Sequence, residues 1–195
     1  MRFILCGAGA VGSLIGGYLH KSGEDVILVC SKRHAEAINK AGLRIRGIQG
    51  SFLLKIPVVS DINDVDLKND DIILFTMKSY DLETAVEKIR TLTSHLRAVC
   101  FQNGLRSEEI VMRRFKRVYG GVVFLNAKFL EPGTILLFNS LKLTHLTLTV
   151  IFIRLIFISL NNSQKKLFHI SNICFILSYR KRNRKQNLRN SFHGI

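Results

Sequence analysis

A glycine-rich turn between a short apolar strand and a helix is the feature that most constrains the fold of this chain. The strand is expected at Arg2–Cys6, and the helix follows at Ala10–Lys21, where apolar residues recur at helical spacing. Between them lies a GxGxxG pattern formed by Gly7, Ala8, Gly9, Ala10, Val11 and Gly12. In such a pattern the first glycine permits a tight turn, the second lets the backbone approach a pyrophosphate, and the third allows close packing of helix on strand. The context favours a dinucleotide site with its phosphates at the helix N-terminus, and a glycine turn without a ligand is the alternative.

Strands and helices alternate over most of the chain. Buried strands are expected at 26–30, 72–76, 98–101 and 118–125, and helices at 34–40, 82–96 and 108–115. The segment 43–59 alternates like a strand and is broken by Gly47 and Gly50. This order predicts an α/β fold, a Rossmann-type doubly wound and mostly parallel sheet covered on both faces, with a dinucleotide-binding domain at residues 1–137.

The positive charge of the chain is concentrated in its tail. Of the net charge of +15, residues 1–140 account for +5, with 19 basic and 14 acidic residues, and residues 141–195 hold 10 basic residues and no acidic one. Residues 138–195 form an apolar and then basic tail that is not a recognisable domain, because glycine and proline are scarce in it.

Two segments of this tail suggest partners. The apolar run 146–160 is too short to span a bilayer and carries Arg154 near its middle, so no membrane span is expected. A second apolar segment, Ile173–Tyr179, precedes a basic cluster at 180–185 that is suited to nucleic acid or anionic lipid. The cluster lacks interleaved aromatic residues, so we interpret it as solvated charge and expect no specific nucleic-acid partner.

The four cysteines argue against a metal site. Cys6, Cys30, Cys100 and Cys174 form no CxxC pair and have no histidines at zinc spacing. We expect them to be buried apolar thiols in a reducing compartment. The N-terminus lacks the charged head and long apolar run of a signal peptide, which predicts a cytoplasmic location.

The residues after the second strand indicate which dinucleotide binds. An acid at this place grips the ribose hydroxyls of NAD, but here the chain has Ser31, Lys32 and Arg33. A hydroxyl and two cations attract a 2′-phosphate through charge-assisted hydrogen bonds, so NADP is the predicted cofactor. The alternative is that Lys32 and Arg33 are solvated residues at a helix start.

Several further segments, in a characteristic order, complete the pattern. Beside the glycine motif they are 33–38 (RHAEAI), 77–81 (MKSYD), 102–105 (QNGL), 120–122 (GGV) and 131–133 (EPG). In these segments, which cover about residues 1–135, the chain resembles the ketopantoate reductase (2-dehydropantoate 2-reductase) family. The resemblance implies NADPH-dependent reduction of 2-dehydropantoate, a small 2-keto acid, to pantoate in pantothenate biosynthesis.

The resemblance also implies roles for three residues. Lys78 and Asn103 each follow the carboxyl end of a predicted parallel strand, where open α/β sheets place their ligands. The family pattern places Lys78 near the nicotinamide, gives Asn103 contacts to both cofactor and substrate, and has Ala127 contact NADP through its backbone. The alternatives are an exposed lysine at a helix start for Lys78 and a plain turn for Asn103.

One part of the family pattern is missing from the tail. In the family, a helical C-terminal domain supplies a general-acid lysine followed by asparagines four and eight positions later. Here Lys165 is followed at those positions by His169 and Ile173, and Lys166 by Ile170 and Cys174. No acidic residue follows Glu131, so the family's later glutamate is missing as well.

We therefore assign no catalytic residue to this chain and expect impaired turnover. Our hypothesis is that the reading frame is interrupted near Leu137 and that an unrelated tail follows. The alternatives are a noncatalytic NADP-binding remnant and a basic-tailed protein associated with membranes or nucleic acid. The oligomeric state stays open.

Overall fold

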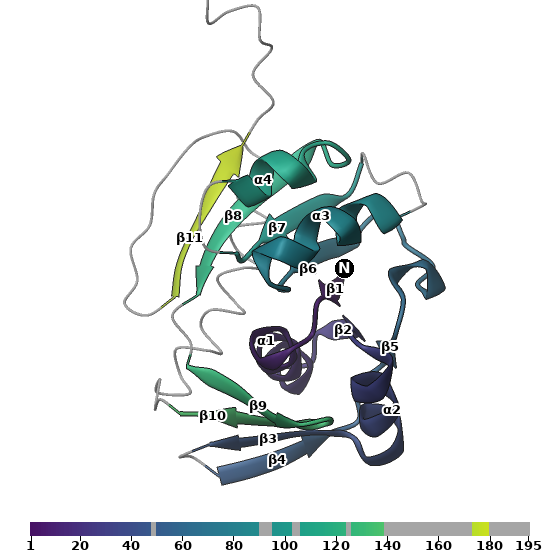
Figure 1. The fold of residues 1–195 in the computed structure, drawn as a ribbon, viewed down its shortest axis with the longest axis vertical. Helices are drawn as coiled ribbons and strands as arrows, with labels where there is room; N and C mark the ends of the chain where they lie inside the picture. The colour runs from purple at the N-terminus through teal and green to yellow at the C-terminus, as the bar shows by residue number, and fades with distance from the viewer. Residues whose placement is uncertain (48–49, 90–94, 103–105, 124–125, 139–172, 180–195) are drawn as a thin grey trace, which may run out of the picture.

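The computed structural model describes residues 1–47, 50–89, 95–102, 106–123, 126–138 and 173–179 (Figure 1). The strands are β1 (Arg2–Cys6), β2 (Asp25–Val29), β3 (Leu43–Gly47), β4 (Gly50–Leu54), β5 (Val58–Val59), β6 (Ile72–Phe75), β7 (Arg97–Cys100), β8 (Arg117–Val123), β9 (Ala127–Glu131), β10 (Thr134–Leu137) and β11 (Ile173–Tyr179). The helices are α1 (Ala10–Lys21), α2 (Lys32–Ala41), the short 3-10 helix η1 (Ile62–Asp64), α3 (Ser79–Lys88) and α4 (Arg106–Val111).

The main sheet confirms the predicted α/β, Rossmann-type architecture. Its strand order is β11-β8-β7-β6-β1-β2-β5, and every pair from β8 to β5 is parallel. The chain runs from β1 outward to β2 on one side and returns to β6 on the other, so the order of the strands switches at β1. In open α/β sheets, ligands bind at the carboxyl ends of the strands at such a switch point.

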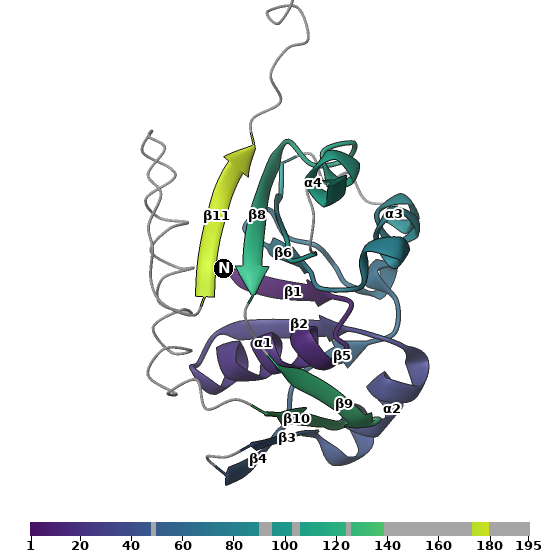
Figure 2. The same cartoon turned by 60° about the vertical axis from the view of Figure 1, so that its left-hand side comes forward.

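Alternation along β1 divides the core into two layers. Phe3 and Leu5 face α1, whereas Ile4 and Cys6 face the layer that contains α3 and α4 (Figure 2). All four are buried, because a parallel strand with helices on both faces is apolar on both sides. On the α3 side, Phe75 and Phe115 meet edge to face with ring centroids 5.8 Å apart.

A second sheet, which the sequence did not predict, covers the outer side of α1. Its order is β4-β3-β10-β9, with β10 parallel to β3 and the other pairs antiparallel (Figure 1). Helix α1 lies between the two sheets: a Cβ on Gly16 would meet Leu28 of the main sheet, and one on Gly17 would meet Ile45 of the second. The two glycines therefore allow the helix to pack closely against both layers.

Three helices differ from their predicted bounds. Helix α2 runs from Lys32 to Ala41 and is slightly longer than the predicted 34–40. Helix α3 begins at Ser79 and ends at Lys88, not at 82 and 96. Ile89 is already extended, and its carbonyl accepts a hydrogen bond of 3.0 Å from Arg114 Nη1. Helix α4 begins at Arg106 and ends at Val111, earlier than the predicted 108–115. The apolar spacing that suggested longer helices continues past both ends because the flanking residues are also buried.

Of the tail after residue 138, the structure describes only β11. It lies antiparallel to β8 at the edge of the main sheet (Figure 2). The basic cluster 180–185 and the apolar run 146–160 lie outside the described residues.

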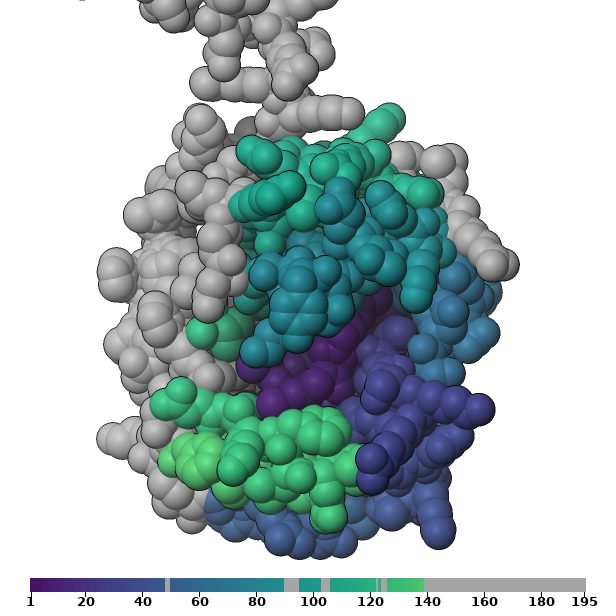
Figure 3. Space-filling model, viewed as in Figure 1, coloured from purple at the N-terminus to yellow at the C-terminus, as the bar shows by residue number. Residues whose placement is uncertain are grey.

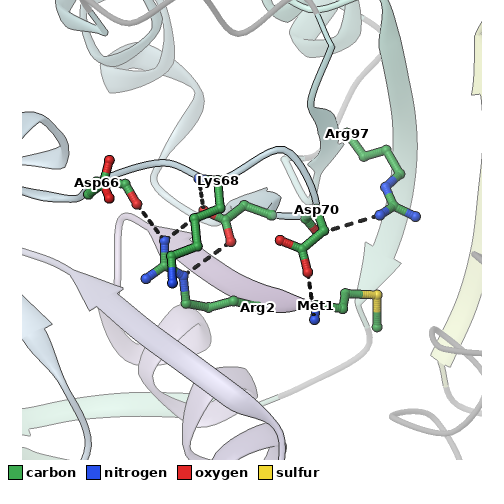
Figure 4. Close-up of polar contacts among 7 residues, drawn as sticks. Met1, Arg2, Asp66, Lys68, Asp70 and Arg97 are labelled. Carbon is green, nitrogen blue, oxygen red and sulfur yellow. Dashed lines mark hydrogen bonds and ion pairs between the residues drawn. The ribbon is translucent and has the colours of Figure 1, made fainter.

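A network of ion pairs and hydrogen bonds joins the amino end of β1 to the segment before β6, and Arg97 at the start of β7 donates to the carbonyl of Asp70 at 3.4 Å (Figure 4). Arg2 donates from Nε and Nη2 to the two carboxylate oxygens of Asp71 at 3.1 and 2.8 Å, and from Nη2 to the carbonyl oxygen of Asp66 at 2.7 Å. The Met1 amino group pairs with Asp70 at 2.8 Å. These contacts lie at the amino ends of the strands, whereas the glycine turn lies at the carboxyl end of β1.

Within the described ranges, no helix is long and apolar enough to cross a membrane.

Candidate functional site

The glycine turn is held by its own backbone and by the strands beside it. The amides of Gly7 and Ala8 both donate to the carbonyl of Val29 at the end of β2, at 3.0 and 2.9 Å. Gly7 has a φ of +88°, and a Cβ there would overlap the backbone of Met77, so only glycine fits. Thr76 Oγ1 donates toward the carbonyls of Cys6 and Gly7, each at 3.1 Å.

The two remaining glycines of the motif differ in what surrounds them. A Cβ on Gly12 would overlap Thr76 and approach the carbonyl of Gly7, so this glycine serves the packing of α1 on the sheet. A Cβ on Gly9 would have only one neighbour, the carbonyl oxygen of Gly7 at 3.9 Å. Since no protein atom requires a glycine at Gly9, the space beside its backbone is left open for a ligand, as the pyrophosphate interpretation requires.

The N-terminus of α1 faces this space with its charge unneutralised. Gly9 is the N-cap, no side chain of the described residues caps the helix there, and its first turn contains no acidic residue. His20 and Lys21 lie in the last turn, where positive charge complements the helix dipole. The exposed amides and the positive end of the dipole suit an anion at Gly9.

A hollow of about 630 Å³ opens above the turn (Figure 3). In Figure 3 its floor is formed by purple N-terminal atoms, between the teal surface of α3 and the green surface of β9 and β10. The lining comes from five segments: Gly7, Ala8, Gly9, Ala10 and Val11; Cys30, Ser31 and His34; Thr76, Met77, Lys78, Ser79 and Asp81; Phe101 and Gln102; and Ala127 and Phe129. The volume lies within the range of small-molecule and cofactor sites.

A second hollow of about 330 Å³ adjoins the first on the α3 side of the sheet. The two share Gly7, Cys30, Ser31, Met77 and Asp81. The smaller one continues to Ser60, Asp61 and Ile62 after β5 and to Thr84 and Lys88 on α3. The shared residues place the two hollows next to each other at the switch point of the sheet.

The structure brings most of the predicted site residues together. Gly7 to Val11, Ser31, Lys78 and Ala127 all line the larger hollow, and Gly12 lies behind it as a packing residue. Lys32 and Arg33 are exposed in the first turn of α2, directly after Ser31, and are not among the lining residues. Asn103 lies outside the described residues.

Lys78 occupies the N-cap of α3 and its side chain is exposed. This position fits the alternative that Lys78 is only an exposed lysine at a helix start. It also fits a ligand contact, because Lys78 lines the larger hollow. Its neighbour Met77 is held from the next strand by Gln102 Nε2, which donates at 3.0 Å to the carbonyls of Phe75 and of Met77.

Several lining residues had been given no role from the sequence. Among them are Thr76, which holds the glycine turn, and His34 and Phe129, whose rings lie 4.8 Å apart between α2 and β9. Thr76 could have been found because it follows a buried strand directly. The pairing of His34 with Phe129 depends on the second sheet and leaves no local signal in the sequence.

The thiols near the site are unreactive at neutral pH. Burial raises the pKa of Cys6 and of Cys30 to about 12, and burial together with the Glu108 carboxylate raises the pKa of Cys100. All three cysteines are free. In the part of the chain that the structure describes, no three His, Cys, Asp or Glu residues form a group that could hold a metal ion.

Comparison with known proteins places this geometry in a family. The profile described as "Ketopantoate reductase PanE/ApbA" matches residues 3–146. The chain belongs to the ketopantoate reductase family. It is 38% identical over 135 residues to a 2-dehydropantoate 2-reductase of Pyrococcus horikoshii, covering 69% of this chain and 44% of the relative. A protein of the same description from Archaeoglobus fulgidus is 35% identical over 133 residues, covering 68% and 42%.

Solved structures of ketopantoate reductases and of D-mandelate dehydrogenase share the fold. A PanE/ApbA family ketopantoate reductase from Ralstonia eutropha JMP134 aligns with a TM-score of 0.65 and 28% identity, over 70% of this chain and 46% of that one. A D-mandelate dehydrogenase solved with NADH and anilino(oxo)acetate aligns with a TM-score of 0.64 and 28% identity, over 71% and 46%. This member of the family thus spans less than half the length of the relatives that it matches.

Proposed function

We propose that this chain binds NADP(H) across the two adjoining hollows. The single observation that carries the proposal is the open space beside Gly9, which no protein atom fills, at the uncapped N-terminus of α1. Both the space and the unpaired helix end suit a pyrophosphate. The D-mandelate dehydrogenase structure with NADH supports a nicotinamide dinucleotide in this fold.

The sheet order gives the dinucleotide a direction. Pyrophosphate at the end of β1 leaves the adenosine half toward β2 and the nicotinamide half toward β6 and β7. The smaller hollow, with Ser60 and Ile62 at its far side, then receives adenine. Lys78 and Ala127 then lie along the nicotinamide half, and Asn103, which follows Gln102, is proposed to contact the cofactor and the substrate.

The preference for NADP over NAD is proposed from the residues after β2. Ser31 lines both hollows, and the exposed Lys32 and Arg33 follow it at the start of α2. A 2′-phosphate on the adenosine ribose is negative, so these two cations attract it, whereas the carboxylate that NAD-selective sites carry there would repel it.

The proposed reaction is the reduction of 2-dehydropantoate to pantoate in pantothenate biosynthesis. It is supported by the family and by the description of several relatives as 2-dehydropantoate 2-reductases. When bound, NADPH supplies the hydride. Lys78 contributes an exposed cation beside the site that attracts the carboxylate of a 2-keto acid. The alcohol oxygen also needs a proton, which a positioned general acid delivers with a gain of about 10²–10⁴-fold in rate.

A second candidate function is NADP binding without turnover. The residues after 138 contain no lysine with the asparagine spacing that the family resemblance implies for the general acid. Beside the end of β6, the ionisable side chains among the described lining residues of the larger hollow are Lys78 and Asp81.

Two measurements on the full chain test both candidates. Isothermal calorimetry with NADPH and NADH should give a dissociation constant for NADPH at least about tenfold lower, because each charge-assisted hydrogen bond contributes roughly 1.5–3 kcal/mol. Failure of both nucleotides to bind at millimolar concentration would refute the proposal. With binding established, oxidation of NADPH in the presence of 2-dehydropantoate supports the reductase, and binding without oxidation supports the second candidate.

A further inference from the structure

His34 lies in a chain of hydrogen bonds that ends on the glycine turn. The side chain is 1% exposed, and its Nδ1 accepts a hydrogen bond of 2.9 Å from the amide of Gly133. Its Nε2 lies 3.0 Å from Ser13 Oγ, which donates at 2.8 Å to the carbonyl of Ala8. Because Nδ1 accepts, the proton of the neutral ring lies on Nε2 and is donated to Ser13.

These bonds join three segments that are far apart in the sequence. His34 is 21 residues from Ser13 and 99 residues from Gly133. The segments are the phosphate turn with α1, the start of α2, and the β9–β10 turn, where Gly133 has a φ of +83° after Pro132. Phe129 of β9 packs against the His34 ring at 4.8 Å, so the ring is fixed on its face as well as at both nitrogens. We call the Gly133–His34–Ser13–Ala8 chain the His34 bridge.

We propose that His34 is a positioning residue for nucleotide binding, whose neutral ring holds the phosphate turn against the second sheet. The inference rests on the proposed function for its effect on the nucleotide. Ala8 lines the larger hollow and Ser13 does not, so the His34 bridge acts on the turn from behind. His34 is itself among the lining residues of the hollow, as are Ser31 and Phe129.

Protonation breaks the bridge at a defined atom. An imidazolium carries N–H groups at both nitrogens, so Nδ1 can no longer accept from Gly133, and two donors then face each other in a buried place. Burial lowers the pKa of His34 from its ordinary value of 6.5, which keeps the ring neutral at neutral pH. As the pH falls below 6.5 the unfolded chain takes up this proton before the folded chain does, so stability falls as well.

The other charged groups around the bridge are lysine, arginine and carboxylate side chains. Lys32, Arg33 and Glu36 share α2 with His34, Lys78 and Asp81 line the same hollow, and Glu131 precedes the β9–β10 turn, where it accepts a hydrogen bond from Thr134. Among side chains with unperturbed pKa values, only histidine changes its charge between about pH 5 and 8. Cys30, also in the lining, has its pKa raised to about 12.

The direction of the effect distinguishes positioning from simple charge. A new positive charge beside the phosphates would by itself strengthen nucleotide binding at low pH. Loss of the bridge weakens it instead, because the turn is released. We expect the affinity for nucleotide to fall about tenfold between pH 7.5 and 5.5, which corresponds to about 1.4 kcal/mol.

The test uses calorimetry on the full chain with NAD⁺ beside NADP⁺. The 2′-phosphate of NADP⁺ has its own ionisation near pH 6, so NAD⁺ isolates the contribution of the protein. His34→Gln retains an amide donor for Ser13, and His34→Asn retains an acceptor for Gly133, and neither titrates. Both variants should lose the acid step, whereas His95→Gln, which removes an exposed histidine, should keep it. An unchanged acid step in His34→Gln, or an affinity that rises on acidification, overturns the proposal.

A readout without nucleotide separates this inference from the proposed function. In ¹⁵N-labelled protein the His34 ring should show its proton on Nε2. When the pH is lowered below 6.5, the midpoint temperature of thermal unfolding should fall in the wild type and in His95→Gln but not in His34→Gln. If the midpoint of His34→Gln follows the same pH profile as the wild type, the His34 bridge has no such role. If these results hold but no nucleotide binds, the bridge stands and the NADP assignment fails.

Discussion

The amide nitrogen Nε2 of Gln102 lies 3.0 Å from the carbonyl oxygen of Met77 and thereby ties the end of β7 to the loop after β6. The same nitrogen donates to the carbonyl of Phe75 at 3.0 Å. The two accepting residues come just before Lys78, the N-cap of α3. The position of that lysine therefore depends on the side-chain amide of Gln102, which follows the neighbouring strand β7. Gln102 is 9% exposed, so water has little access to replace these bonds.

Replacing Gln102 with methionine, which has a similar size and no amide, should misplace the nicotinamide end of the site. The carbonyl of Met77 then loses its buried donor, which costs about 1–3 kcal/mol in the free energy of unfolding measured with urea. Affinity for NADPH should fall, but affinity for adenosine 2′,5′-bisphosphate, which lacks the nicotinamide half, should not change. Equal losses for both ligands would place the effect on the whole site instead.

Gly9→Ala should separate folding from binding. A Cβ there has only the Gly7 carbonyl as a neighbour, at 3.9 Å, and the φ of Gly9 is −78°. The free energy of unfolding should therefore change by less than about 1 kcal/mol. The methyl group occupies the space that we assign to the pyrophosphate, so calorimetry should show at least about a tenfold loss of affinity for NADPH and NADH alike. A variant that folds and binds as the wild type does would remove the phosphates from this place.

The buried ion pair between Arg2 and Asp71, at the amino end of β1, should affect stability and not nucleotide binding. The Asp71 side chain is 0% exposed and that of Arg2 is 15% exposed. Arg2→Met leaves the carboxylate with the amide of Lys68, at 2.8 Å, as its hydrogen-bond donor among the described residues, and should cost about 3 kcal/mol in the free energy of unfolding measured with urea. NADPH affinity of the folded variant should be unchanged. Arg44→Met, which removes an exposed arginine from β3, is the control and should change stability by less than about 0.5 kcal/mol. If Arg2→Met lowers the free energy of unfolding by no more than the Arg44→Met control does, the Arg2–Asp71 pair contributes no more than an exposed ion pair.

Much of the main sheet could be predicted because its signals are local. The strand β1 is an uninterrupted apolar run that ends in a glycine turn, and both its bounds and those of α1 are confirmed. Such runs arise because parallel strands are buried on both faces. The turn itself was recognisable from its sequence context, and its three glycines have three different surroundings: a positive φ at Gly7, open space beside Gly9 and close packing at Gly12. The pyrophosphate contact of Gly9 stays a prediction.

The second sheet had no comparable signal. Strand β9 is mostly exposed, with Phe129 and Leu130 at its surface, so it shows no buried face. Strand β10 pairs in parallel with β3, which lies about 90 residues earlier in the chain, and such a register is not encoded in either segment alone. The His34 bridge depends on this pairing, because Gly133 reaches His34 only when the β9–β10 turn lies beside α2. For the same reason the sequence could show that His34 belongs to the segment 33–38 but not which residues its ring contacts.

The residues after β2 should decide between the two nicotinamide cofactors. Lys32→Ala and Arg33→Ala should each weaken NADPH binding by about tenfold and leave NADH binding within twofold, since only NADPH carries the 2′-phosphate. Lys40→Ala, which removes an exposed cation from the last turn of the same helix, is the matched control. Ser31→Asp should go further and favour NADH, because a carboxylate at this place accepts from the ribose hydroxyls and repels the phosphate.

Calorimetry with both nucleotides on these four variants tests the assignment. Since neither Lys32 nor Arg33 is among the lining residues of either hollow, their contribution requires the side chains to reach the phosphate from the exposed first turn of α2. Salt screens exposed charges such as those of Lys32 and Arg33, so the ratio of the affinities for NADPH and NADH should fall when NaCl is raised from 50 mM to 500 mM. A preference that is independent of salt and unchanged in both alanine variants would leave Ser31 and the hollow itself as its source.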